Sequence, residues 1–205
     1  MKKMGNMQWR PAFVRSLFCI KINCNNSLNI VPLEQINLRK QGRTVMAKKM
    51  EKTNVMRLLE QKKVPYESHC YVDAATTVGT EVAAVLGQDP NRVFKTLVTV
   101  GGKTKQNFVF VIPVNQELDL KKAANAVGEK SIEMIKSKEL LPLTGYIHGG
   151  CSPIGMKKFF TTTVHESAKN FGTIFFSGGK IGYQVEVSPE DLGKMIRFEY
   201  ADLCE

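Results

Sequence analysis

The sequence lacks the short motifs that mark several familiar enzyme classes. It contains no Gly-x-Ser-x-Gly elbow, no Gly-x-x-x-x-Gly-Lys phosphate loop and no pair of histidines in a His-Glu-x-x-His arrangement. The sequence contains three histidines, which are His69, His148 and His165. Each is better explained as a structural or exposed side chain than as a catalytic one. We therefore expect no metal site, no other cofactor, and a reaction that needs no catalytic triad.

Paired cysteines are also absent. The five cysteines are odd in number, widely scattered and without a Cys-x-x-Cys pair: Cys19, Cys24, Cys70, Cys151 and Cys204. This usage is typical of a reducing compartment, so we expect a cytoplasmic protein. Cys151 allows two interpretations, because it lies in a glycine-rich loop and three residues after His148. It is either a small loop residue or a nucleophile.

Acidic residues are scarce at the start of the chain. The net charge is +10, but residues 1–45 hold eight basic side chains against Glu34 alone, which leaves 21 basic and 18 acidic residues in the remainder. The predicted domain over residues 46–205 therefore carries only +3, and the overall basicity is weak evidence that this domain binds RNA.

No stretch of residues 1–45 is long and apolar enough to span a bilayer, so we expect no membrane contact. Met46-Ala47-Lys48-Lys49 reads like an ordinary protein start. Three interpretations of the basic extension stay open: a disordered tail or mis-assigned upstream start, an arm that attracts RNA, and a targeting segment.

The periodicity after Thr53 alternates between helices and strands. Thr53, Asp119 and Ser188 are predicted helix caps, and a helix is expected from about Thr80 to Leu86, before Gly87. A hairpin is expected over Phe94–Val100 and Asn107–Val114. Short strands joined by tight turns favour an α+β fold with a mixed, mostly antiparallel sheet and flanking helices.

Lys95 is the main candidate for a site residue. It lies in Val93-Phe94-Lys95-Thr96-Leu97, a run that is otherwise apolar and prone to form a strand. An ammonium group there loses hydration unless an anionic group meets it, which implies a phosphate, a carboxylate or an acidic partner. The alternative is an outward-facing lysine on an alternating strand.

Two glycine loops support a site. Gly149-Gly150-Cys151-Ser152-Pro153-Ile154-Gly155 could present backbone N–H groups to an oxygen atom, and Ser177-Gly178-Gly179-Lys180 follows an apolar run. Together with Lys95, these loops resemble those of the YbaK/EbsC family of aminoacyl-tRNA deacylases, relatives of the editing domain of bacterial prolyl-tRNA synthetases. The resemblance extends from about Thr53 to Ala201 and includes further short matches: His69-Cys70-Tyr71, Leu118-Asp119-Leu120-Lys121-Lys122 and Thr144-Gly145-Tyr146.

The resemblance implies a curved, barrel-like sheet and a set of site residues. Lys95 would hold the 3′-terminal phosphate or the charged end of the aminoacyl-adenosine, and Gly149 would present its amide to the ester carbonyl as the second catalytic group. The remaining matched positions would bind substrate: Tyr71, Val78, Thr96, Gly150, Ser152, Pro153, Ser177 and Gln184.

The implied activity is removal of cysteine from mischarged Cys-tRNA(Pro), with attack by the substrate's own thiol; this is lyase-like if a cyclic thiolactone is released. Gln184 stands where the family tends to have an aspartate, and no histidine lies between Ser177 and Gln184 as in the alanine-specific relatives. The alternatives are a deacylase for alanine or another small residue, and a non-catalytic RNA- or nucleotide-binding regulator. The expected partner is the 3′ end of tRNA(Pro), bound by the domain alone or together with prolyl-tRNA synthetase.

Overall fold

The computed structural model describes residues 51–74 and 76–205, so the predicted extension over residues 1–45 lies outside the described residues. The α-helices are α1 (Asn54–Gln61), α2 (Gly79–Leu86), α3 (Leu120–Ala126), α4 (Ser137–Thr144) and α5 (Pro189–Met195). The strands are β1 (Glu67–Cys70), β2 (Phe94–Gly101), β3 (Asn107–Pro113), β4 (Ile132–Met134), β5 (Thr161–His165), β6 (Ile174–Ser177), β7 (Tyr183–Val187) and β8 (Phe198–Ala201). Within the described ranges, no helix is long and apolar enough to cross a membrane.

Short polar side chains begin three of these helices, as the sequence predicts. Thr53 accepts a hydrogen bond from the Met56 amide, Asp119 accepts from the amides of Lys121 and Lys122, and Ser188 accepts from the Asp191 amide. Each cap satisfies amides that have no partner within the helix. The helix predicted to end before Gly87 is also confirmed, with Gly87 in the left-handed conformation at φ 65°.

A five-stranded sheet in the order β4-β2-β3-β5-β8 forms the centre of the described fold. The predicted hairpin is confirmed as the β2–β3 pair, whose register aligns Phe94 with Pro113 and Val100 with Asn107. The central strand β3 is buried on both faces, which explains its nearly continuous apolar sequence. Phe110 lies on the face that packs against α3, and Val111 on the face that packs against α1 and α5.

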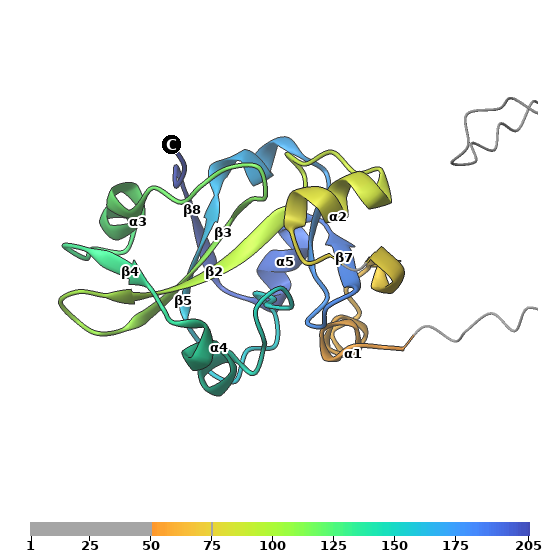
Figure 1. Cartoon of the computed structure of the whole chain (residues 1–205), viewed down its shortest axis with the longest axis horizontal. Coiled ribbons are helices and arrows are strands. Elements are labelled where there is room, and N and C mark those ends of the chain that lie inside the picture. Colours follow the sequence, from red (N-terminus) through yellow and green to blue (C-terminus); the bar gives the residue numbers. More distant parts are fainter. Residues whose placement is uncertain (1–50, 75) are drawn as a thin grey trace, which may run out of the picture. The chain divides into compact units, whose positions relative to one another are not determined.

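The second sheet has three antiparallel strands in the order β1-β7-β6. A bridge between Val93 and Phe175 connects β6 to the chain just before β2, and the Phe175 amide donates to the Arg92 carbonyl at 2.9 Å. Figure 1 shows β2 running from the region of α2 and the small sheet towards β4 and α3. The start of β2 therefore lies at the junction of the two sheets.

The expectation of a mixed α+β fold is confirmed, but the described strands form two open sheets rather than a barrel-like sheet. Four of the six strand pairs are antiparallel, while β5 pairs in parallel with both β3 and β8. Strand β1 has only four residues, and the chain enters a 3₁₀ turn at Val72–Ala74 soon after it. Strand β8 was not predicted, since four residues are too few to establish a period.

Truncation of Phe110 is expected to destabilise the fold strongly. Phe110 is fully buried, so Phe110→Ala should lower the free energy of unfolding by about 3–5 kcal/mol through lost burial and the cavity left behind. Phe159 is fully exposed, and Phe159→Ala should change stability by no more than about 0.5 kcal/mol. Guanidinium unfolding curves of both variants measure this difference. Equal stability losses would contradict the assignment of the core.

Candidate functional site

A pocket of about 550 Å³ lies at the junction of the two sheets. Its walls come from the start of β2, the N-terminus of α2, the first turn of α4 and the loop that follows α4. Seven of the ten residues predicted from the sequence line this pocket: Tyr71, Val78, Lys95, Thr96, Gly149, Ser177 and Gln184. They come from six separate parts of the chain, so only the fold brings them together.

Lys95 is the cationic group of the pocket wall. Its side chain is 26% exposed, and its Nζ lies 3.0 Å from Glu117 Oε1. The Glu117 side chain is 81% exposed, so water screens this ion pair and its net stabilisation is small. An anionic ligand can therefore replace the Glu117 carboxylate at low cost.

Sequence reasoning missed Glu117, although the predicted hairpin contained a signal for it. The β2–β3 register places Pro113 opposite Phe94, so the chain that leaves β3 passes beside the start of β2. Glu117 follows Pro113 by four residues, within reach of Lys95.

Two buried oxygen atoms in the pocket wall have no hydrogen-bond partner within the described part of the chain. They are Thr96 Oγ1 and Gln184 Oε1, and Gln184 is only 5% exposed. A buried polar atom without a partner costs about 1–3 kcal/mol, which a ligand that supplies the missing hydrogen bond would recover. Gln184 pairs across β7 and β6 with Ser177, so an amide oxygen and a hydroxyl lie side by side on this wall.

The glycine loop contributes one of its predicted residues to the pocket. Gly149 has φ +79°, and a Cβ atom at this position would lie 2.9 Å from Thr77 Cβ, so both the backbone conformation and the contact favour glycine. The Gly150 amide donates to the Ile147 carbonyl at 3.0 Å within the loop. Gly150, Ser152 and Pro153 are buried and do not line the pocket. Their substrate-binding roles stay predictions.

Tyr71 lines a buried part of the pocket, and Val78 lines an exposed part. Tyr71 is 7% exposed, and burial raises the pKa of its phenol, so the hydroxyl stays protonated at neutral pH and can donate. Val78 is 53% exposed and precedes α2 at its N-cap, where it offers an apolar contact at the pocket rim.

Cys151 also lines the pocket, but its chemistry does not suit a nucleophile. Burial raises the pKa of its thiol to about 12, so the thiol is almost entirely protonated at neutral pH. The exposed His148 lines the same pocket. Of the two interpretations of Cys151, the structure favours the small buried loop residue.

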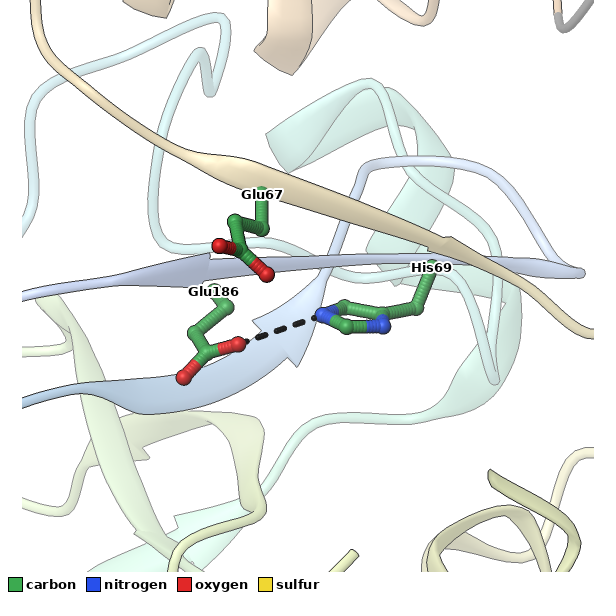
Figure 2. Close-up of side chains that lie close together, drawn as sticks. All are labelled: Glu67, His69 and Glu186. Atoms are coloured by element: carbon green, nitrogen blue, oxygen red, sulfur yellow. Dashed lines mark hydrogen bonds and ion pairs between the residues drawn. The ribbon is translucent and has the colours of Figure 1, made fainter. Parts of the chain in front are cut away.

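A cluster of charged side chains lies on the small sheet, and sequence reasoning missed it. Figure 2 shows Glu67 and His69 on β1 facing Glu186 on β7, and ligand atoms of the three lie within 4.8 Å of one another. Such a group could hold a metal ion. However, Glu186 Oε1 already accepts from Arg92 Nη2 at 3.0 Å and from the Thr173 hydroxyl, while Oε2 lies 3.3 Å from His69 Nε2. The protein's own cations and donors thus account for Glu186 without an ion.

Fold and pocket together define an α+β domain whose described pocket lining has one lysine, two buried oxygen atoms without partners and a protonated thiol. The model of a family described as "Aminoacyl-tRNA editing domain" matches residues 72–195 of the chain. This match covers more than half of the sequence, and the chain belongs to that family.

One relative supports this assignment, and two solved structures share the fold. The chain is 49% identical over 161 residues to EbsC of Enterococcus faecalis, named as a candidate Cys-tRNA(Pro)/Cys-tRNA(Cys) deacylase, and the match covers 77% of this chain and 98% of that protein. A structure titled as a candidate trans-editing enzyme for prolyl-tRNA synthetase shares the fold with a TM-score of 0.63 at 24% identity, over 75% of this chain and 98% of the other. A hypothetical protein designated APE2540 matches with a TM-score of 0.67 at 22% identity, over 74% and 99%.

The cysteines are expected to differ sharply in reactivity. Raising the thiol pKa from 9.0 to about 12 lowers the thiolate fraction of Cys151 about a thousandfold at neutral pH, and burial blocks access as well. Iodoacetamide should therefore label the exposed Cys70 in the native protein, but Cys151 and Cys204 only after unfolding. Peptide mass spectrometry resolves each site, and Cys70→Ser serves as the control. Labelling of native Cys151 as fast as Cys70 would show that its thiol is accessible and reactive.

Proposed function

We propose that this protein deacylates mischarged Cys-tRNA(Pro), acting on the tRNA 3′ end after release from the synthetase. The observation that carries this proposal is the convergence of Lys95, Thr96, Gly149, Ser177 and Gln184 on one pocket at the sheet junction. Family membership and the name of the 49% identical relative support the substrate class.

The pocket suits a substrate that is already activated. An aminoacyl ester needs an enzyme to position it and to stabilise negative charge on its carbonyl oxygen. In the proposed complex, the Lys95 ammonium leaves Glu117 and binds the phosphate of the terminal adenosine. Gly149 lines the same pocket, and its backbone amide is proposed to bind the carbonyl oxygen.

The other wall is proposed to hold the amino acid. A substrate ammonium group has three N–H donors, and Gln184 Oε1 and Thr96 Oγ1 are acceptors that lack a partner in the described chain. Because the Gln184 amide is neutral, it would bind the ammonium less strongly than a carboxylate. Its buried position still makes an unfilled acceptor costly, which favours ligands with a donor at this point.

The attacking group is proposed to be the substrate's own thiol. The cysteine sulfur attacks its carbonyl carbon, a C–S bond forms, the ester C–O bond breaks, and the ribose oxygen leaves with a proton. The released cyclic thiolactone is then hydrolysed by water. The high thiol pKa of Cys151 supports this route, because the thiol nearest the Gly149 loop is held in its unreactive form.

We further propose that the domain works in the cytoplasm and binds tRNA through its 3′ end, alone or with prolyl-tRNA synthetase. The charge of residues 46–205 is only +3, which gives limited electrostatic attraction to a whole tRNA. This small charge fits recognition of the tRNA by the pocket and its surroundings better than long-range electrostatic attraction of the tRNA to the whole domain.

Loss of Lys95 should remove most of the activity. Lys95→Ala deletes a charge-assisted contact worth about 1.5–3 kcal/mol, so kcat/KM for Cys-tRNA(Pro) should fall more than tenfold. Glu117→Gln is the matched control, because it breaks the same ion pair and leaves the ammonium free for substrate. Its activity should equal or exceed wild type. A folded Lys95→Ala variant with wild-type turnover would sink the proposed role.

The thiol mechanism makes a second prediction, which depends on the substrate. Ser-tRNA(Pro) presents a hydroxyl in place of the thiol and should be deacylated at least about a hundredfold more slowly than Cys-tRNA(Pro), because an un-ionised alcohol is a much weaker nucleophile. Cys151→Ser should retain its activity on Cys-tRNA(Pro). The measurement is the deacylation rate of Cys-, Ser- and Ala-tRNA(Pro) by the wild type. Equal rates would refute attack by the substrate thiol, and a preference for Ala-tRNA would establish the alternative specificity.

A further inference from the structure

A second hollow adjoins the pocket and has no role in the chemistry described above. It has a volume of about 520 Å³ and lies between the turn end of the β2–β3 hairpin and helix α4. We call it the α4 groove, and its walls are formed by Val100, Asn107, Ile135, Lys138, Glu139, Pro142 and Leu143. Ile135 also lines the main pocket, so the two hollows share a wall.

The walls of the α4 groove suit one face of a nucleobase. Val100, Ile135, Pro142 and Leu143 provide apolar surface, on which a base can pack when it leaves water. Asn107 supplies an edge contact. Its Nδ2 donates to the Thr99 carbonyl at 3.2 Å, which fixes the amide and leaves Oδ1 as the atom that can accept from an exocyclic amine.

The charge at the groove suits a phosphate. Lys136 and Lys138 are exposed, and in the described part of the chain neither forms an ion pair. Lys138 lines the α4 groove, and Lys136 lies on the other side of Ser137 in the chain, which lines the main pocket. Lys136 is the N-cap of α4 and makes no capping bond with its side chain. Lys138 and Glu139 are the one basic and the one acidic residue that line the groove, and the exposed Lys136 lies beside them in the chain.

From this arrangement, we propose that the α4 groove binds the nucleotide that precedes the terminal adenosine of the tRNA, with its base on the apolar walls and its phosphate at Lys136 and Lys138. The inference rests on the proposed function, because it places the terminal adenosine in the main pocket. Adjoining hollows with a shared wall fit consecutive nucleotides of one strand. The groove would thus extend recognition from the aminoacyl ester to the single-stranded end.

The test uses two small substrates, cysteine esterified to adenosine and cysteine esterified to the dinucleotide cytidylyl-adenosine. For the full-length wild type, the added nucleotide should raise kcat/KM about tenfold or more, in line with one stacked base. In Lys136→Ala/Lys138→Ala this gain should largely disappear, while the rate on the adenosine ester stays the same. The dependence of the dinucleotide rate on salt should also weaken in the double variant, since fewer counterions are displaced.

Two further variants sharpen the comparison. Lys62→Ala removes an exposed lysine after α1 that lines neither hollow, and it should keep the full gain. Glu139→Gln removes the acidic group of the groove and should increase the gain. A dinucleotide gain that persists in the double lysine variant, or no gain in wild type, overturns the inference and leaves the proposed function standing. If the wild type hydrolyses neither ester, the proposed function is wrong, and the inference that rests on it is wrong as well.

Discussion

The pocket depends on the point where the two sheets meet. Val93 bridges to Phe175 of the small sheet, and the next residue, Phe94, already pairs with Pro113 in the large sheet. Because side chains alternate along a strand, this switch fixes where Lys95 and Thr96 can point. Ser177 follows Phe175 by two residues on β6, so the same bridge sets the position of the opposite wall. This contact between the sheets therefore positions the parts of the pocket lining that come from β2 and β6, while α2, α4 and the loop after α4 supply other parts.

A network of charged and aromatic groups strengthens this junction. The Arg92 guanidinium bonds to the Thr173 carbonyl and to Glu186, and it lies 4.9 Å from the ring centroid of Phe175. His69 packs edge-on against the same ring and pairs with Glu186 on its other side. Guanidinium–carboxylate and cation–π contacts are worth more when partly buried, as they are here. The cluster in Figure 2 is thus best explained as a clamp that holds the small sheet against the start of β2.

Local features of the fold could be predicted from the sequence. The periodicity of the sequence could not predict which distant residues meet in the pocket. Thr53, Asp119 and Ser188 cap their helices as predicted, because a cap depends only on residues three or four positions away. The unpaired oxygen of Gln184 and the α4 groove result from contacts between distant segments, which no periodicity encodes. Seven of the ten residues that the resemblance named line the pocket. Gly150, Ser152 and Pro153 match the motif but do not line it, and their roles stay predictions.

The polar groups of the pocket are suited to binding a ligand, and its thiol is not suited to forming a covalent bond with one. The fold leaves Thr96 Oγ1 and Gln184 Oε1 buried without partners, at a cost of about 1–3 kcal/mol each, and a protein keeps such costs where a ligand removes them. At the same place, burial holds Cys151 in its protonated form. An unpaired acceptor selects a substrate that carries a donor, whereas a protonated thiol attacks nothing. Cys151 is therefore unsuited to attack a substrate, while Thr96 and Gln184 favour a ligand that carries hydrogen-bond donors.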